Sequence, residues 1–466
     1  MDYFTLFKER NIADGNDDYP HNDIGAARLF YDLHSHAIRY VIEAKTWYTY
    51  TGKAWKKDDG GFYVMEMCKQ FAQAFAKYAE IMDDGMEEGK AFMKYANGFT
   101  GRKRREGLLS DARSISPMSL NWFDRNKALL NLQNGTYNLA AMTFQEHNPN
   151  DYITKLARVK YIEGATCERW EQFINEVMCG DEATAQFLQK AFGYCLSGDT
   201  ALECFFILYG STTRNGKTTL TETIGHLLGD YSRTIAAQTI SRRPTDGTAA
   251  TPDIARLKGA RLVNTPEPEK SLELNIALVK QLTGGDTYTA RFLHENPIEF
   301  HPEFKIFINT NHLPRTSDDT VFTSGRVKLI PFNRHFQPEE QDTGLKKFFR
   351  RHDSKSGIFN WLLEGYRLLQ SEGLAVPDKV KAAVEAYRTE ADIMGAFLND
   401  CTVAQDGNRL PTSDLYAVYA TWAKDNGYRQ MNIKNFVAEL RPRLDIRRGS
   451  VGNVVVGLTL CYIPPA

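Results

Sequence analysis

The spacing of hydrophobic residues along the chain predicts regions with different secondary structure. Residues 1–20 are polar and turn-rich, and we expect them to be a loosely held lead-in. Apolar and aromatic runs at 40–42, 46–50 and 54–55 predict short strands, with a hairpin turn at 51–53. After Gly61 the spacing becomes helical, because apolar residues recur every three or four positions, at Met65, Cys68, Phe71, Phe75 and Tyr78.

The middle and the end of the chain follow two other patterns. Residues 200–345 alternate apolar strands with amphipathic helices, which predicts an α/β domain, and residues 346–389 predict a helical connector. In residues 390–466, two short helical patterns are followed by apolar runs at 444–448 and 454–460 that predict a terminal two-stranded hairpin. Earlier in the chain, Asn134 and Gly135 form a typical hairpin turn within residues 129–139.

Composition narrows the class of protein. The chain has 466 residues, enough for about three domains, and its 42% hydrophobic content is that of a globular protein. Lys and Arg number 57 against 58 Asp and Glu, so any surface for a polyanion must be local. No stretch is long and apolar enough for a signal peptide or a membrane span, and the seven scattered cysteines predict a reduced protein, so we expect a cytoplasmic location and no membrane partner.

A phosphate-binding loop is the most specific chemical signal. A predicted buried strand at 204–209 runs into a small polar loop and then into Gly216, Lys217 and Thr218, which open a helix. Lys217 is expected to reach the β- and γ-phosphates of ATP and Thr218 to bind Mg²⁺. Five residues separate Gly210 from Gly216 instead of four, so either the first glycine is out of register or Ser211 replaces it. The predicted binding residues are Gly210, Ser211, Thr212, Thr213, Arg214, Asn215, Gly216, Lys217, Thr218 and Thr219.

An ATPase also needs an acid and a polar sensor close to the γ-phosphate. Residues 261–267 predict a short strand that ends at Glu267, which is our candidate for the Mg²⁺-binding and water-activating carboxylate, with Glu269 as the alternative. Residues 305–310 predict a buried strand followed by Asn311, which is the sensor candidate, with Asn309 second. Active sites of open α/β sheets lie where such strands end.

These motifs together resemble the superfamily 3 helicases, most closely the poxvirus and phage or plasmid primase-helicase branch. The matching residues are Tyr209 to Lys217, Glu267, the run from Lys280 to Asp286 with Ala290 and Arg291, the run from Thr310 to Pro314, and Arg326 before Ile330, Pro331 and Phe332. The resemblance implies an AAA+-like core at 200–345, a helicase-associated α+β domain at 23–199 after a lead-in at 1–22, a helical connector at 346–389 and a winged helix at 390–466.

The same resemblance implies how the protein would work. It implies a ring, usually a hexamer, with ATP between subunits, in which Arg326 would reach the γ-phosphate of the neighbouring subunit. It also implies a channel hairpin over 287–301 with residues 294–296 at its tip. Lys280, Arg291 and His294 are the candidates for gripping DNA, although the family usually carries a lysine at the tip and this chain has only His294 there.

Two basic segments are candidates for further DNA contacts. Residues 424–448 carry seven basic and three acidic side chains around a predicted helix and hairpin, which is the layout of a winged helix that binds DNA, although such a module can also serve protein contacts. Residues 102–105 are Arg, Lys, Arg and Arg; a solvated loop and a nucleic-acid contact are equally good interpretations of this run.

The sequence therefore predicts an ATP-dependent DNA helicase for replication of a phage, prophage or mobile element, moving 3′ to 5′ as the family does. The paired aspartates at 17–18, 58–59 and 83–84 lie in polar or turn-like contexts, so we expect no primase activity, and a separate primase or polymerase is a candidate partner. Two alternatives stay open: a P-loop ATPase that remodels protein or packages DNA without unwinding, and an origin-binding initiator whose nucleotide site acts as an assembly switch.

Overall fold

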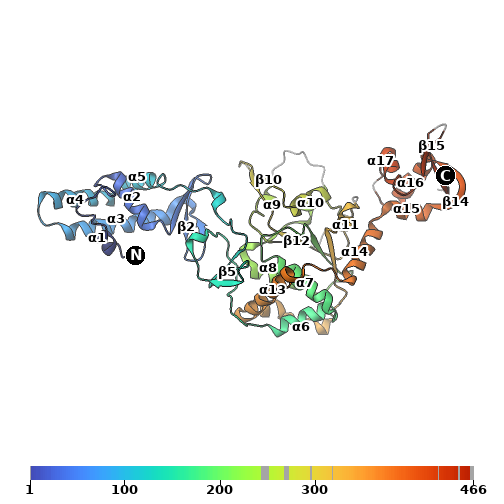
Figure 1. The fold of residues 1–466 in the computed structure, drawn as a ribbon, viewed down its shortest axis with the longest axis horizontal. Helices are drawn as coiled ribbons and strands as arrows, with labels where there is room; N and C mark the ends of the chain where they lie inside the picture. The colour runs from blue at the N-terminus through green and yellow to red at the C-terminus, as the bar shows by residue number, and fades with distance from the viewer. Residues whose placement is uncertain are drawn as a thin grey trace.

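A computed structural model describes residues 2–242, 251–266, 272–293, 296–316, 319–428, 430–449 and 452–461 (Figure 1). A helical N-terminal unit and a small C-terminal unit lie at opposite ends, with a parallel sheet and its covering helices between them. Within the described ranges, none of the helices has the length and apolar character needed to cross a bilayer.

The N-terminal unit packs helices against one face of a small antiparallel sheet. Its helices are α1 (Tyr3–Glu9), α2 (Asp23–His34), α3 (Phe62–Met82), α4 (Glu87–Asn97) and α5 (Arg102–Ala112). Its strands are β1 (Ile38–Val41), β2 (Thr46–Tyr50) and β3 (Trp55–Lys57), in the order β1-β2-β3. The predicted strands, the turn before Trp55 and the long helix after Gly61 are confirmed.

The first residues are part of the packed N-terminal unit, so the expectation of a loosely held lead-in is wrong. Residues 3–9 form α1, and Asp2 caps it by accepting hydrogen bonds from the amides of Phe4 and Thr5. Phe7 is fully buried, with its ring centroid 5.8 Å from that of Phe71 and 5.4 Å from that of Phe75. A helix of this length is only marginally stable by itself, so the burial of the Phe7 ring is what stabilises it.

A second antiparallel sheet joins the N-terminal unit to the central domain. Its strands are β4 (Leu129–Leu132), β5 (Gly135–Asn138) and β6 (Thr143–Gln145), and the turn at Asn134 and Gly135 joins the first two, as predicted. Helices α6 (Glu168–Val177) and α7 (Glu182–Tyr194) follow.

The central domain is built on a parallel sheet with the strand order β13-β7-β12-β9-β8. Its strands are β7 (Phe205–Tyr209), β8 (Ser232–Thr234), β9 (Leu262–Thr265), β12 (Lys305–Thr310) and β13 (Val327–Pro331). An antiparallel hairpin of β10 (Tyr288–Ala290) and β11 (Ile298–Phe300) stands apart from this sheet. The helices are α8 (Lys217–Leu228), α9 (Pro252–Ala255), α10 (Ile276–Thr283), α11 (Thr320–Thr323), α12 (Leu345–Phe349) and α13 (His352–Glu372).

Hydrophobic cores cover both faces of the parallel sheet, and β7 supplies residues to each in alternation. Phe206 and Leu208 join a core that includes α6, α7, α8 and α13. Phe205 and Ile207 join a second core with residues of α10, β12 and β13. The first core also contains residues from Leu130 to Leu196, so packing crosses the predicted boundary at residue 199.

The C-terminal unit follows α14 (Asp378–Ala391), which packs on the core of the sheet through Tyr387 and leads into that unit (Figure 1). It consists of α15 (Ile393–Cys401), β14 (Thr402–Pro411), α16 (Thr412–Asp425), α17 (Ile433–Leu440), β15 (Ile446–Arg448) and β16 (Asn453–Leu460). The predicted hairpin of β15 and β16 is confirmed, and the structure adds β14 on the other side of β16. This additional strand was missed because its middle residues, Asp406 to Asn408, are polar and glycine-containing.

A buried lysine ties the parallel sheet to the end of α7. The Lys305 ammonium donates to the carbonyl oxygens of Ser197 (2.6 Å) and Asp199 (3.0 Å) and lies 4.3 Å from the ring centroid of Tyr194. Its side chain is almost fully buried, and burial lowers the pKa of Lys305 from 10.5 to about 8. The group therefore connects two layers of the domain at an electrostatic cost.

We expect Lys305→Met to destabilise the central domain by about 1–3 kcal/mol at pH 7, because the carbonyl groups would lose their donor. The folded protein binds fewer protons at Lys305 than the unfolded chain between pH 8 and pH 10.5, so this group's contribution to the free energy of unfolding rises with pH across that range. Urea unfolding at pH 7 and pH 9.5 should therefore show a larger deficit for the variant at pH 9.5.

A matched control is Lys381→Met, whose side chain is 63% exposed on α14, and a change of no more than about 0.5 kcal/mol is expected there. An equal deficit for Lys305→Met at both pH values would contradict the account of this lysine.

Candidate functional site

The predicted phosphate-binding loop lies at the carboxyl end of β7. Residues 210–216 connect this strand to α8, whose first residue is Lys217. Ser211, Thr212, Thr213 and Arg214 are exposed, whereas Asn215 is buried and its amide nitrogen donates to the carbonyl of Thr212 (2.6 Å). The strand, the loop and the helix therefore have the arrangement that the sequence predicts.

Both glycines of the loop occupy positions that admit no side chain. Gly216 has φ +87°, and a Cβ atom there would lie 2.4 Å from a methyl group of Val177 on α6. A Cβ atom on Gly210 would lie 2.5 Å from the carbonyl oxygen of Phe332 and 2.4 Å from the amide nitrogen of Asn215. Gly210 is therefore needed for close packing, although the loop is one residue longer than usual. Ser211, the alternative to this glycine, is exposed.

Lys217 extends across the carboxyl edge of the sheet. Its side chain is 5% exposed, and its ammonium donates to Asn311 Oδ1 (2.7 Å) and to the carbonyl oxygen of Gly210 (3.4 Å). The parallel register pairs Thr310 with Tyr209, which brings the residues directly after β12 and β7 side by side.

The two candidate asparagines have different environments. Asn309 lies within β12, and its amide nitrogen donates to Thr221 Oγ1 (3.0 Å) and to Asn264 Oδ1 (2.9 Å), joining α8 to β9. Asn311 is less buried and contacts Lys217. The geometry therefore favours Asn311 as the side chain that faces a ligand of Lys217, and it gives Asn309 a structural place.

A segment that the sequence analysis did not single out braces the loop. After β13, the chain contacts the loop at two residues: His335 Nδ1 is 2.8 Å from the carbonyl oxygen of Thr213, and the amide of Phe336 donates to the carbonyl oxygen of Arg214 (3.0 Å). The Arg214 guanidinium also contacts Gln341. β13 pairs in parallel with β7, and Pro331 lies beside Tyr209. The residues that follow Ile330, Pro331 and Phe332 therefore lie next to the loop that follows Tyr209.

The acid candidates Glu267 and Glu269 lie outside the described residues. The strand that leads to them is β9, which pairs with β12 as far as Thr265 and Ile308, so it ends at the same edge as Asn311. Two polar atoms at this edge, Thr265 Oγ1 and Asn309 Oδ1, are buried without a hydrogen-bond partner. A polar edge of this kind fits a site that holds water or a ligand.

The residues that are described fit ATP and Mg²⁺. Lys217 supplies a cation, the loop supplies small residues and exposed hydroxyls, and Thr218 at the first turn of α8 is exposed. Mg²⁺ in such sites is held by a hydroxyl, a carboxylate and the phosphates themselves. In the described ranges no three His, Cys, Asp or Glu side chains gather, so nothing there offers an all-protein metal cage.

Arg326 lies at the amino end of the parallel strands, whereas Lys217 lies at their carboxyl end. Val327, the first residue of β13, pairs with Phe205, and Pro331 at its end pairs with Tyr209 next to the loop. At about 3.3 Å per residue, these four steps separate Arg326 from the loop by roughly 13 Å or more. Arg326 instead contacts Glu203 and Thr283, so the structure does not bring it together with Lys217.

The candidates for a DNA-gripping hairpin are only partly described. The antiparallel pairing of β10 and β11 is confirmed between Tyr288 and Phe300. Arg291 follows β10 and is exposed, whereas Lys280 lies on α10 and contacts Thr320. His294 lies outside the described residues.

The basic run at 102–105 forms the first turn of α5 and is largely used within its own unit. Arg104 forms an ion pair with Asp23 (2.7 Å) and lies over the ring of Phe99 (4.2 Å). Arg102 pairs with Glu106 (2.8 Å), and Arg105 contacts the carbonyl of Thr100. The run is therefore part of a helix and not the solvated loop of the first interpretation, and its contacts favour a role within the unit over a nucleic-acid contact.

Aspartates from two of the three pairs act as backbone acceptors. Asp58 is buried and accepts from the amides of Tyr63 (3.2 Å) and Val64 (3.0 Å) at the start of α3. Asp83 and Asp84 accept from the amides two residues further on, in the turn before α4. Such contacts are typical of caps and turns.

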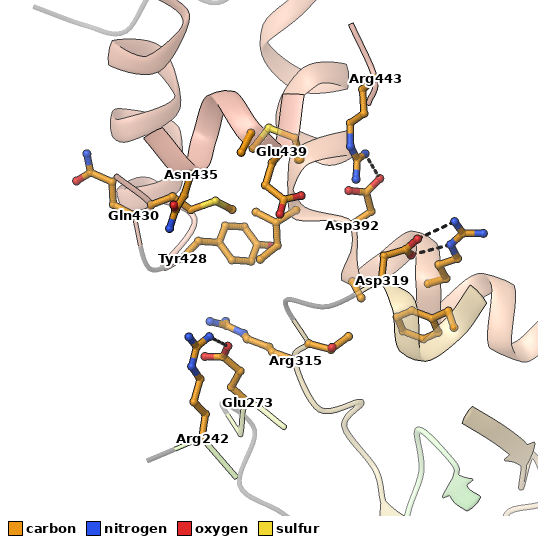
Figure 2. Close-up of a pocket in the computed structure, with 18 of the residues that line it drawn as sticks. Arg242, Glu273, Arg315, Asp319, Asp392, Tyr428, Gln430, Asn435, Glu439 and Arg443 are labelled. Atoms are coloured by element: carbon orange, nitrogen blue, oxygen red, sulfur yellow. Dashed lines mark hydrogen bonds and ion pairs between the residues drawn. The ribbon is translucent and has the colours of Figure 1, made fainter. Parts of the chain in front are cut away.

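A cavity of about 540 Å³ lies between the central domain and the C-terminal unit (Figure 2). Its charged lining is largely paired, with Arg242 on Glu273, Arg388 on Asp319 and Arg443 on Asp392. Arg315 crosses the boundary: it lies 5.3 Å from the ring centroid of Tyr428 and donates to the carbonyl of Gly427 (3.3 Å). Because these charges are paired, the cavity has no excess of positive charge that would attract an anion. We interpret it as the boundary between the two units.

Comparison with known families finds matches at both ends of the chain. Residues 27–179 match the family described as "D5 N terminal like", and residues 389–447 match the family described as "Poxvirus D5 protein-like". The C-terminal match covers α15, β14, α16 and α17 together with the start of β15.

Curated viral proteins are similar over longer stretches. "Putative helicase L207/L206" of Acanthamoeba polyphaga mimivirus is 28% identical over an alignment of 421 residues, and the match covers 83% of this chain and 44% of that protein. "Putative helicase 022R" of Frog virus 3 is 27% identical, covering 53% of this chain and 27% of that protein. "Putative helicase V13" of the Sputnik virophage is 23% identical, covering 74% and 45%. The chain spans less than half the length of these relatives.

A solved structure, the apo NrS-1 C-terminal region, is similar across 91% of this chain and 97% of that one, with a TM-score of 0.50 and 11% identity. At this identity the likeness shows the fold alone: a mixed α/β protein with a parallel sheet and an N-terminal domain.

Proposed function

Because the chain belongs to the poxvirus D5-like branch of the superfamily 3 helicases, as its motifs predict and the family matches confirm, we propose that it is an ATP-dependent DNA helicase. The viral relatives favour a role in replication of a virus or mobile element, in the cytoplasm of its host. The observation that carries the proposal is the contact between Lys217 and Asn311 at the carboxyl edge of the parallel sheet.

The proposed roles of the site residues follow from their positions. Backbone amides of residues 211–217 and the start of α8 would hold the phosphates, and Lys217 would leave Asn311 to bind the β- and γ-phosphate oxygens. Thr218 and Glu267 would hold Mg²⁺, which when bound neutralises charge that develops on the transferred phosphoryl group. Asn311, released from Lys217, would orient the attacking water.

A ring is proposed because Arg326 cannot serve the nucleotide of its own subunit. A guanidinium at the edge of the sheet opposite the loop is suited to complete the site of a neighbouring subunit, where it would stabilise negative charge in the transition state. We propose a homo-hexamer in which the β10 and β11 hairpin, with Arg291 and His294, lines the central channel and holds single-stranded DNA through its phosphates.

The C-terminal unit is proposed to be a winged helix that contacts duplex DNA at the fork. Its order of helices and strands and the basic residues around α17, β15 and β16 support this, among them Arg441, Arg447 and Arg448. Arg447 forms an ion pair with Asp445 (2.7 Å), and Arg443 is paired with Asp392. Arg441 and Arg448 are therefore the stronger candidates for phosphate contacts.

Lys217→Ala should lower ATP turnover by at least about 100-fold, because a charge that faces the phosphates would be removed.

Asn311→Ala should lower the rate of hydrolysis and leave nucleotide affinity within a few-fold of that of the unaltered protein. Asn309→Ala, a matched change two residues away, should lower stability by about 1–3 kcal/mol without the same loss of turnover per folded molecule. Phosphate release and fluorescent-nucleotide binding measure these effects; normal turnover by Lys217→Ala would overturn the site.

Arg326→Ala should retain nucleotide binding and assembly and lose hydrolysis. Mixing it with Lys217→Ala should restore part of the activity, since mixed rings contain interfaces with one intact Lys217 facing one intact Arg326. Steady-state turnover across a titration of the two variants measures this. No recovery at any ratio, with mixed assembly verified by differently tagged subunits, would contradict action between subunits.

A further inference from the structure

The environment of Arg326 carries an inference beyond its role at the subunit interface. Its backbone is fixed, because its carbonyl accepts from the amide of Phe205 (2.9 Å) where β13 begins to pair with β7. Its side chain is 18% exposed, and its guanidinium is held on two sides. Nη2 forms an ion pair with Glu203, and Nη1 donates to Thr283 Oγ1 (3.2 Å) and lies 3.5 Å from the carbonyl oxygen of Lys280.

Glu203 is placed for this contact by an uncommon backbone conformation. It has φ +44°, in the left-handed region that residues other than glycine rarely adopt, and its amide donates to the carbonyl of Thr200 (2.9 Å). This turn directly precedes β7 and directs the carboxylate toward the start of β13. The Glu203 side chain is 49% exposed, so the ion pair is one that a competing anion can displace.

The other partners of Arg326 belong to the end of α10. Thr283 is the last residue of this helix, and its hydroxyl donates to the carbonyl of Val279 (2.8 Å) while it accepts from Arg326. Gly284 and Gly285 follow, and the β10 and β11 hairpin begins three residues later. Arg326 is therefore a donor to the last turn of the helix that leads into the hairpin.

We propose that Glu203 and Thr283 are positioning residues for Arg326 that couple it to the hairpin. In an isolated subunit, Glu203 holds the guanidinium in a retracted position against Thr283. When the neighbouring subunit presents a nucleotide γ-phosphate, Arg326 exchanges the carboxylate for the phosphate and withdraws its hydrogen bond from the end of α10. The hairpin of the subunit that donates Arg326 thereby gains freedom to move when the neighbour binds ATP. This inference rests on the proposed trans role of Arg326.

The first test is ATP turnover with and without single-stranded DNA. Glu203→Gln keeps an acceptor and removes the charge, so it should raise DNA-independent kcat by roughly two- to fivefold with little change in KM. Glu203→Asp should return the rate toward that of the unaltered protein. Glu222→Gln, a matched control whose carboxylate is paired with Lys346 on α12, should have no effect. An unchanged DNA-independent rate in Glu203→Gln overturns the retracted state.

The second test separates this inference from the proposed function. In an Arg326→Ala background, which is expected to hydrolyse no ATP, Glu203→Gln should leave amide hydrogen exchange at residues 280–290 unchanged, and a change that persists there would show that Glu203 acts without Arg326 and overturn the proposal. Amide hydrogen exchange, which needs no activity, should increase at residues 280–290 in Arg326→Ala and in Thr283→Val. Unaltered exchange overturns the link to the hairpin, whereas failed complementation between Arg326→Ala and Lys217→Ala overturns the proposed function itself.

Discussion

The structure depends on the parallel register of β7 and β12, because this pairing places Lys217 against Asn311. Tyr209 and Thr310 lie side by side at the ends of these strands, so the loop after one and the asparagine after the other meet at the same edge. The neighbouring strands extend the arrangement: β9 ends next to β12 on one side, and β13 supplies the segment that braces the loop on the other. The fold thus positions groups from distant parts of the sequence by strand order alone.

The same sheet accounts for the proposal that a neighbouring subunit completes the nucleotide site. The amino and carboxyl ends of the parallel strands lie on opposite sides of the domain. Arg326 directly precedes β13, and the other end of β13 borders the loop. On the proposed mechanism, a chain built this way would contribute Lys217 to one nucleotide site and Arg326 to the next. Lys and Arg number 57 against 58 Asp and Glu, and arginines such as Arg104, Arg261 and Arg388 make contacts within the chain, so any surface for a polyanion is local.

The sequence predicted elements whose signals are local, and it missed those that depend on tertiary contacts. The strand, loop and helix around Gly216, the hairpin at Asn134 and the long helix after Gly61 follow from spacing and turn residues. The helix that buries Phe7 did not, because its stability comes from aromatic neighbours some 65 residues away. Neither could the roles of His335 and Glu203 be predicted, since their partners are reached only once the strands pair. The choice between Asn309 and Asn311 likewise required the side-chain contacts.

The central claim is that ATP hydrolysis at this site separates DNA strands, and strand displacement on a forked duplex tests it most directly. The account predicts that this chain releases a labelled strand when ATP and Mg²⁺ are supplied, and that release stops with a non-hydrolysable ATP analogue. Hydrolysis that single-stranded DNA stimulates, without any displacement of the strand, would contradict the claim and favour a remodelling or initiator ATPase instead.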